Sequence, residues 1–377
     1  MTAIERTDLL IAKLVEDFKN ISNNPLMYRN DFAGVYIKDD IFHIILVNNA
    51  DIEHYQKLFN DNSVEYHYTD VSFTDLIQTR NWLRDYYDRF GIVSAAIIDE
   101  LSVIELTITD ENSITTIKQF LLDHNFTKSF INAHFSFVVG TPLHIYFDEE
   151  QLPNDCRTVN ATTYTANPGK KLQGYNTYSS STLSLASVGF SAKTTVNGIV
   201  TAWHYAVHTS KHYWGSYTSN GYFATNASNI NSSMYDAAFI PFNSGDGSTT
   251  NVSKTINNTN KTLTHVATTN TISALSGKTL HFYGHKNPNS IGTVNSTSVD
   301  YVMSYTNSSG TTSTITIKDT IRTTGASLDH GDSGGPVTYE GTSNITLVGI
   351  VSGKSSTYQY ISKITNIRSA LGVSVTG

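Results

Sequence analysis

The sequence changes character near residue 150, and this change constrains the fold more than any other feature. Before it, apolar side chains recur at helical spacing in residues 4–18, 74–90 and 113–124. Apolar runs between these segments are typical of strands, at 32–37, 41–47, 93–99 and 102–109. Units of strand, strand and helix that repeat in this way predict an α+β domain over residues 1–150.

After residue 150 helical spacing disappears, and Ser, Thr, Asn, Gly and Tyr dominate to about residue 360. Short β-branched runs recur between turn residues, at 185–190, 196–203, 237–242, 278–284, 299–305, 312–318 and 346–352. This pattern predicts an all-β sandwich or barrel over residues 166–377, with one helix near its end. Residues 151–165 have neither pattern and are predicted to link the two domains.

Charge is divided unevenly between these parts. The chain has 377 residues and a net charge of −7, but residues 166–377 hold 13 Lys and Arg against 7 Asp and Glu, so the surplus of negative charge lies before them. We expect the two parts to attract each other, although two unrelated domains with different surfaces would show the same imbalance. The basic residues are spread thinly, which argues against nucleic acid as a partner.

Cysteine and hydropathy exclude several other classes. Cys156 is the only cysteine, so an intrachain disulfide is excluded, and no Cys/His spacing is typical of a zinc site. We therefore predict no metal and no cofactor. No apolar run reaches the roughly 18 residues that span a bilayer. The apolar residues 9–12 are flanked by Glu5, Asp8 and Lys13, unlike a signal peptide, so either a signal was removed or export takes another route.

The motif most informative about chemistry is Gly331–Pro336, with the sequence GDSGGP. Acyl transfer needs a hydroxyl on a sharp turn, with backbone N–H groups directed at the oxygen that becomes negative. Glycines on both sides of Ser333 allow that turn. We predict Ser333 as a nucleophile and the N–H groups of Gly331 and Ser333 as the oxyanion hole. The alternative is a glycine-rich hairpin turn with a solvated serine.

A serine nucleophile needs a base and a carboxylate that orients it. His204 follows the apolar run 196–203, which would hold it rigidly, whereas His208 and His212 have the setting of surface histidines. Of the six acidic residues between His204 and Ser333, only Asp236 directly precedes a compact apolar run. The order His204, Asp236, Ser333 is that of chymotrypsin, not that of subtilisin or the α/β-hydrolases.

These residues carry a family resemblance. Thr201–His204 (TAWH) resembles the motif around the base of chymotrypsin-like serine proteases, and Gly331–Pro336 resembles their nucleophile motif. Leu347–Gly353 resembles the strand that lines their substrate cleft. Ser187–Ser191 (SVGFS) and the C-terminal residues 371–377 resemble the bacterial α-lytic protease and streptogrisin group.

The resemblance implies a protease domain of two six-stranded antiparallel β-barrels over residues 166–377. It implies that residues 1–150 are a pro-region that assists folding and inhibits the enzyme, in a secreted endopeptidase acting on protein or peptide substrates. Thr165 and Ala166 resemble the maturation junction of α-lytic protease, so we predict self-cleavage there. The mature chain would not begin with the Ile-Val pair of trypsin-like zymogens, so a new N-terminus is not expected to insert into the core.

By position, the primary specificity pocket is expected between two short segments. One wall is predicted from Ser327, Leu328 and His330, and the other from Ser352, Gly353 and Lys354. Ser327 stands where trypsin-like enzymes carry an acidic residue, so a preference for Lys or Arg is not expected. A small or medium apolar residue before the cut is predicted, and a preference for acidic residues is the alternative.

Two departures from the family stand beside the predicted base. Relatives carry a disulfide next to the histidine, where this chain has Tyr205, and a glycine before it, where this chain has Trp203. Neither change removes a reacting atom. Two other readings stay open: a catalytically silent protease fold that serves as a binding or adhesion module, and an enzyme held permanently inhibited by its acidic N-terminal domain.

Overall fold

The computed structural model describes residues 2–21, 28–144, 148–151, 163–176, 182–214, 223–225, 230–242, 249–306, 312–341 and 344–376. The chain divides into two compact units. Unit 1 comprises Met1–Leu143, Thr268–Lys278 and Thr293–Met303, and unit 2 comprises His144–Ala267, Thr279–Gly292 and Ser304–Gly377. Most of the predicted linker, residues 152–162, lies outside the described residues.

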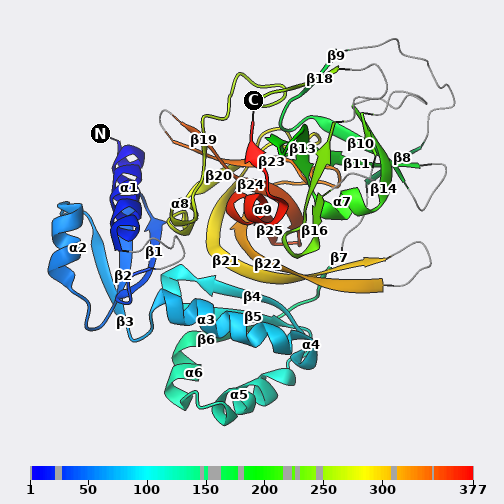
Figure 1. The fold of residues 1–377 in the computed structure, drawn as a ribbon. Coiled ribbons are helices and arrows are strands. Elements are labelled where there is room, and N and C mark those ends of the chain that lie inside the picture. The colour runs from blue at the N-terminus through cyan, green and yellow to red at the C-terminus, as the bar shows by residue number, and fades with distance from the viewer. Residues whose placement is uncertain are drawn as a thin grey trace. The chain divides into compact units, whose positions relative to one another are not determined.

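Unit 1 is built from two similar strand and helix motifs (Figure 1). In each, an antiparallel hairpin is followed by helix and then by a third strand that runs parallel to the second. The first motif contains β1 (Phe32–Lys38), β2 (Ile41–Val47), α2 (Ile52–Phe59) and β3 (Glu65–Thr69). The second contains β4 (Ile92–Ile98), β5 (Val103–Ile108), α5 (Ser113–Asp123), α6 (Lys128–His134) and β6 (Phe135–Val139). The predicted strands 32–37 and 41–47 are confirmed as β1 and β2, and 93–99 and 102–109 as β4 and β5, whereas β3 and β6 were not predicted.

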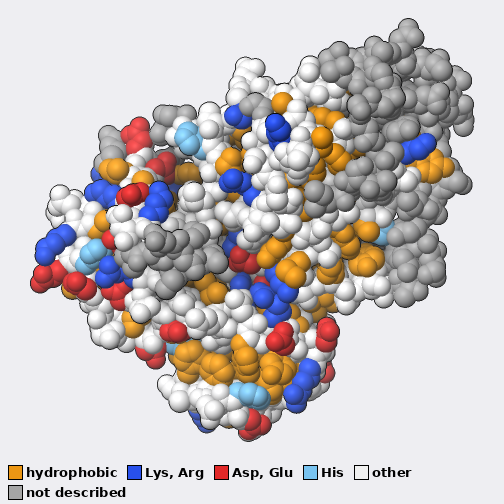
Figure 2. All heavy atoms as spheres, in the orientation of Figure 1, with side chains coloured by type: hydrophobic (Ala, Val, Ile, Leu, Met, Phe, Trp, Pro, Cys, Tyr) orange, Lys and Arg blue, Asp and Glu red, His pale blue; other side chains and the backbone are white. Residues whose placement is uncertain are grey.

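Three further helical segments complete this part of unit 1: α1 (Ala3–Ile21), α3 (Phe73–Leu83) and α4 (Tyr87–Phe90). The single helix predicted over 74–90 is divided, because the 3₁₀ turn η1 (Arg84–Tyr86) separates α3 from α4. One face of α1 packs Leu10, Leu14 and Phe18 into a core shared with the strands. Hydrophobic side chains also gather on the surface over α3, α5 and α6 (Figure 2). Trp82 of α3 stacks on Phe120 of α5, with ring centroids 5.5 Å apart.

The remaining segments of unit 1 come from the second half of the sequence. Residues 268–278 contain α8 (Thr269–Ser273), and residues 293–303 are the middle of the long strand β21 (Ser290–Thr306). β21 pairs antiparallel with β4, with Ser298 opposite Ile97 and Tyr301 opposite Ser94. β21 therefore pairs with β4 although it begins about two hundred residues later in the sequence.

Unit 2 consists mostly of strands, which confirms the predicted change from helix to strand near residue 150. One sheet contains the run β20-β23-β24-β25-β22, which continues into β21. A second has the order β16-β17-β13-β12-β26 and a third β15-β14-β10-β11-β8, and β9 pairs with β18. The first sheet contains β20 (Thr279–Phe282), β22 (Thr312–Thr324), β23 (Pro336–Glu340), β24 (Ile345–Lys354) and β25 (Tyr358–Lys363). The second contains β12 (Phe190–Lys193), β13 (Asn197–Thr201), β16 (Ile230–Ser232), β17 (Ala237–Pro241) and β26 (Ser374–Val375). Closure into two six-stranded barrels stays a prediction.

The other strands of unit 2 are short. They are β8 (Asp148–Gln151), β9 (Thr163–Ala166), β10 (Lys171–Asn176), β11 (Thr182–Ser187), β14 (Thr209–Trp214), β15 (Ala224–Thr225), β18 (Thr249–Val252) and β19 (His265–Val266), with β7 (Leu143–His144) at the boundary of the units. Two helices, α7 (Trp203–Val207) and α9 (Ile364–Leu371), accompany them (Figure 1). The predicted C-terminal helix is thus confirmed. Among the described residues no helix has the length and hydropathy needed to cross a membrane.

Candidate active site

His204 and Asp236 are brought together by the second sheet of unit 2. β13 ends at Thr201 and α7 begins at Trp203, so His204 lies on the first turn of a short helix, not at the end of the strand as predicted. Asp236 follows the 3₁₀ turn η4 (Ser233–Tyr235) in a left-handed conformation, with φ of 43°, and directly precedes β17. Because β13 and β17 are neighbours, the ends of both strands deliver these side chains to one place.

The Asp236 carboxylate is completely buried and holds His204 in two ways. Nδ1 of His204 lies 2.9 Å from both Oδ1 and Oδ2, and the backbone N–H of His204 donates to Oδ1 at 3.0 Å. A buried carboxylate is tolerated only where donors satisfy it. With Nδ1–H donating to Asp236, the neutral imidazole presents Nε2 as an acceptor, which is the form a general base requires.

Ser352 provides a further donor to the same carboxylate. Its hydroxyl on β24 donates to Oδ2 of Asp236 at 2.5 Å, and its side chain is completely buried. We predicted Ser352 as part of the specificity pocket, but its hydroxyl is directed at Asp236, so only its backbone is left for that role. Sequence analysis did not identify this supporting contact, although Ser352 stands in the strand that resembles the family's cleft strand.

The turn that carries Ser333 is held by unit 2 strands on both sides. The Ser333 carbonyl accepts from the Ser187 N–H at 2.8 Å, and the Gly334 N–H donates to Val351 at 2.8 Å. Gly334 has φ of 82°, and a Cβ at this position would lie 2.2 Å from Thr201 Oγ1. The turn therefore packs against the residues that lead to His204. Ser333 is half-buried, and within the described residues its hydroxyl makes no hydrogen bond.

The backbone beside Ser333 is arranged as an anion site. The N–H groups of Gly331 and Ser333 donate to no acceptor among the described residues. The Gly331 carbonyl, which lies between them in sequence, accepts from Ser187 Oγ at 2.8 Å and is 2.8 Å from Nδ1 of His285. Burial lowers the pKa of His285, which favours the neutral ring that donates through Nδ1–H. Neither Ser187 nor His285 was predicted as a site residue.

Asp332 has a structural role that sequence analysis also missed. Its completely buried carboxylate accepts from the backbone N–H groups of Lys286 at 2.8 Å, Asn287 at 3.0 Å and Asp329 at 2.9 Å. The side-chain amide of Asn287 adds a contact of 2.7 Å. These donors already satisfy the buried carboxylate of Asp332. An ammonium group from a newly formed N-terminus is therefore not needed to pair with it.

The predicted pocket residues are only partly brought together. Ser327 and His330 are exposed, whereas the Leu328 side chain is buried. Lys354 links the two predicted walls, because its ammonium group donates to the Leu328 carbonyl and lies 3.5 Å from Oδ1 of Asp329. The positive charge of Lys354 is therefore already partly neutralised.

The two departures from the family are accommodated in the core. Trp203 is buried and meets Tyr305 edge to face, with ring centroids 5.9 Å apart. Tyr205 is buried in a hydrophobic cluster and its hydroxyl lies 3.1 Å from Nδ1 of His212. Burial raises the pKa of Tyr205 well above its ordinary value. The residue after His204 is thus a packed, buried tyrosine.

Thr165 and Ala166, the predicted cleavage junction, lie at the end of β9. They pair in parallel with Asn251 and Val252 of β18, and the Ala166 carbonyl accepts from Ser191 Oγ at 3.0 Å. Thr165 is exposed, whereas Ala166 is completely buried.

Comparison with known proteins places this arrangement in a family. The family model described as "Trypsin" matches residues 175–371, just over half of the chain. Thermobifida fusca protease A and a Nocardiopsis protease are 22% and 20% identical, each covering 56% of this chain and 100% of that protein's solved chain at a TM-score of 0.39. A glutamic-acid-specific serine protease is 21% identical, with 55% of this chain and 99% of that one covered at a TM-score of 0.39.

The sequence comparison with curated proteins found no match. The matched span of the family model contains His204, Asp236 and Ser333, and it covers the sheets that position them. The chymotrypsin-like fold expected from the sequence motifs is thereby confirmed for the second half of the chain. This protein belongs to the trypsin family, whose members are serine peptidases.

Proposed function

We propose that the protein is a serine endopeptidase that acts through Ser333, His204 and Asp236. Nε2 of His204 takes the proton from Ser333 as its oxygen attacks the peptide carbonyl. The N–H groups of Gly331 and Ser333 stabilise the oxyanion, and Asp236 stabilises the imidazolium. His204 then protonates the leaving amine, and water repeats these steps on the acyl-enzyme. No cofactor or metal takes part in this reaction.

The observation that carries the proposal is the contact between His204 and Asp236, with Nδ1 2.9 Å from both carboxylate oxygens. It fixes the tautomer that leaves Nε2 basic. The packing of Gly334 against Thr201, three residues before His204, supports the position proposed for Ser333. The N–H groups of Gly331 and Ser333, which donate to no acceptor in the part of the chain that the structure describes, support the oxyanion hole.

We further propose that residues 1–150 are an inhibitory, folding-assisting pro-region of a secreted proenzyme. The pairing of β4 with β21 supports a specific attachment, because β21 belongs to the span that matches the trypsin family. Cleavage between Thr165 and Ala166 would have to precede the pairing of β9 with β18, or follow its opening, because a protease binds its substrate as an extended, unpaired segment.

For specificity we propose a small or medium apolar residue before the cut. The alternative preference for acidic residues relied on Ser327, His330 and Lys354. Since Lys354 already contacts Asp329 and the Leu328 carbonyl, its charge is less available to a substrate carboxylate. A panel of peptides that differ only at the residue before the cut tests this choice, and equal rates for all of them would contradict both preferences.

Labelling with a fluorophosphonate probe tests the catalytic proposal. The parent protein, Ser333→Ala and the control Ser369→Ala, which changes an exposed serine of α9, are compared before and after limited proteolysis. Labelling of the parent and the control but not of Ser333→Ala supports the proposal. Labelling that appears only after proteolysis identifies an enzyme inhibited by its N-terminal region. No labelling in either state would favour the silent binding or adhesion module.

A further inference from the structure

A cluster of metal-ligating side chains lies on the sheet of β1, β2 and β3, within unit 1. His43 on β2 is paired with Glu65 on β3, and Ile45 is paired with His67. Because side chains alternate along a strand, His43, Glu65 and His67 project from the same face of the sheet. The opposite face carries Phe42 and Ile44 into the core.

The three ligand atoms lie at the spacing that one ion requires. Nδ1 of His43 is 3.0 Å from Nε2 of His67 and 3.3 Å from Oε2 of Glu65, and the last two atoms are 3.9 Å apart. A triangle with these sides has a circumscribed radius of about 2.0 Å, which is the length of zinc bonds to imidazole nitrogen and carboxylate oxygen. An ion at the centre of this triangle would lie at bonding distance from all three atoms, and small rotations of the side chains would give it the tetrahedral geometry of zinc.

We propose that His43, Glu65 and His67 form a binding site for a divalent transition ion of the zinc class. Two imidazoles and one carboxylate form a donor set that suits zinc, whereas calcium and magnesium prefer oxygen ligands alone. The Tyr36 hydroxyl lies 3.3 Å from Nε2 of His67, so it or a water molecule would supply the fourth ligand.

The surroundings give the site both support and an entrance. The His43 side chain is buried and its ring stacks on Tyr36 at 4.5 Å between centroids, with 2° between the planes, which fixes the ring orientation. The side chains of Glu65 and His67 are 52% and 42% exposed, so an ion can enter from solvent. Lys38, the nearby cation, pairs with Glu100 at 2.6 Å and does not occupy the cluster.

Zinc at this site would join β2 to β3, in addition to the parallel ladder between these strands. Sequence analysis found no zinc spacing because one ligand comes from β2 and two come from β3, in an arrangement unlike the paired Cys or His motifs of zinc fingers. The only sequence signal is the alternation Glu65-x-His67, which becomes informative once His43 is known to be its neighbour.

The test uses the untagged full chain carrying Ser333→Ala, freed of metal by chelation and dialysis. Zinc is titrated against a chromophoric chelator, and cobalt is added separately to record visible d–d bands. We expect one equivalent of zinc per chain, cobalt bands typical of nitrogen and oxygen ligands, and a rise in Tm on the order of 5–10 °C at saturating zinc. His67→Ala and Glu65→Gln should each weaken zinc binding by more than about tenfold.

His124→Ala is the matched control, because it removes an exposed histidine from the same unit and should leave zinc binding unchanged. Far-UV circular dichroism verifies that each variant is folded. Glu65 is exposed, so Glu65→Gln is expected to fold even if His67→Ala does not. Absence of cobalt bands in the parent, or zinc affinity in Glu65→Gln equal to that of His124→Ala, would overturn the proposal and leave a hydrogen-bonded cluster of side chains.

Discussion

The hydroxyl of Ser352 lies 2.5 Å from Oδ2 of Asp236, on the carboxylate whose Oδ1 accepts the backbone N–H of His204. Asp236 therefore accepts a hydrogen bond from the backbone of α7 through Oδ1 and one from β24 through Oδ2. Nδ1 of His204 lies within hydrogen-bond distance of both oxygens. This relationship makes the position of the base depend on two separate sheets of unit 2.

Ser352→Ala should lower kcat about tenfold with little change in KM. The variant removes one hydrogen bond to a charged, buried acceptor, a contact typically worth about 1.5–3 kcal/mol, and leaves Asp236 freer to turn away from His204. Asp236→Asn should be far more damaging, by about 10⁴-fold, because it favours the wrong tautomer of His204. Steady-state kinetics on a peptide substrate measure both.

Ser362→Ala is a suitable control for that comparison. Its hydroxyl is also buried, on the neighbouring strand β25, but has no hydrogen-bond partner among the described residues. If Ser352→Ala were as active as Ser362→Ala, the contact with Asp236 would have no part in positioning the base.

Ser187→Ala should reduce kcat roughly five- to tenfold through the oxyanion hole. Ser187 Oγ donates to the Gly331 carbonyl and accepts the backbone N–H of His285. The Gly331 carbonyl belongs to the peptide group between the two proposed oxyanion donors, so removal of the Ser187 hydroxyl leaves that peptide group less firmly held. Ser184→Ala changes a buried serine on the same strand whose hydroxyl has no partner among the described residues, and should be neutral. Equal kcat values for the two variants would argue against this role.

Acid should destabilise the folded chain in part through His208. Burial, with a smaller effect from the charge of His204, lowers the pKa of His208 from 6.5 to about 4. The unfolded chain therefore binds the proton more readily, so this contribution to stability is complete above pH 6.5 and is lost as the pH falls toward 4. Between pH 7 and 5 the parent should lose roughly 1–2 kcal/mol more than His208→Phe.

Urea unfolding at the two pH values, in a Ser333→Ala background that prevents self-digestion, measures this difference. His124→Ala, which removes an exposed histidine, should follow the parent. A loss of stability in His208→Phe as large as that of the parent would show that His208 protonates equally well in both states.

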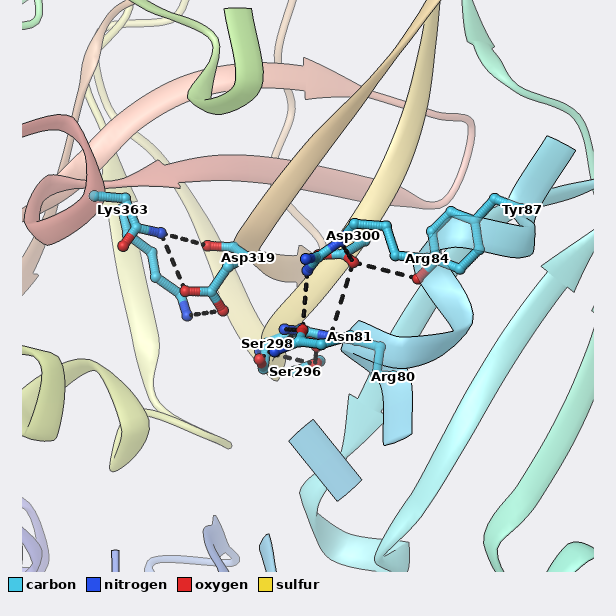
Figure 3. Close-up of polar contacts among 10 residues, drawn as sticks. Arg80, Asn81, Arg84, Tyr87, Ser296, Ser298, Asp300, Asp319 and Lys363 are labelled. Carbon is cyan, nitrogen blue, oxygen red and sulfur yellow. Dashed lines mark hydrogen bonds and ion pairs between the residues drawn. The ribbon is translucent and has the colours of Figure 1, made fainter. Parts of the chain in front are cut away.

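Asp300→Ala should destabilise unit 1 by about 3–5 kcal/mol. Asp300 is completely buried on β21 and lies 2.7 Å from Nε of Arg84, 3.2 Å from the Tyr87 hydroxyl and 3.9 Å from Nε of Arg80 (Figure 3). Arg80 is itself 2% exposed, so removal of Asp300 leaves a buried guanidinium without its counter-ion. Burial and the charge of Asp300 also raise the pKa of Tyr87 well above its ordinary value.

Thermal and urea unfolding of the full chain with Ser333→Ala test this prediction. Asp85→Asn, which changes an exposed carboxylate on the adjacent 3₁₀ turn, should alter the free energy of unfolding by less than about 0.5 kcal/mol. If Asp300→Ala were equally mild, the ion cluster would not contribute to the attachment of residues 1–143 to β21.

Net charge was an incomplete guide to these attachments. Arg80 and Arg84, two cations of the acidic first part of the chain, pair with Asp300, an anion of the basic second part. Composition suggests the opposite arrangement, with anions from the first part and cations from the second. Lys278 with Asp8, at 3.1 Å, has the expected sign. Composition averages over many solvated side chains, whereas buried ion pairs depend on the few charges that the strands carry inward.

The sequence alone determined the features that depend on local spacing: the first two strands of each motif in unit 1, the change to an all-β chain, and the candidates His204, Asp236 and Ser333. It did not predict β3, because Glu65–Thr69 is polar and half-exposed and lacks the apolar run of a buried strand. It also placed His204 at the end of a strand, where strand meets loop, and not on α7, since a five-residue helix is too short to show a period.

Tertiary structure decided the contacts between residues far apart in the chain. Ser352 on Asp236, Ser187 and His285 on the Gly331 carbonyl, and His43 beside Glu65 and His67 all depend on which strands become neighbours. Strand pairing is a property of the whole sheet, and each of these side chains has an ordinary setting in its own segment. Local sequence therefore supplied the reacting groups, and only the fold showed what holds them in place.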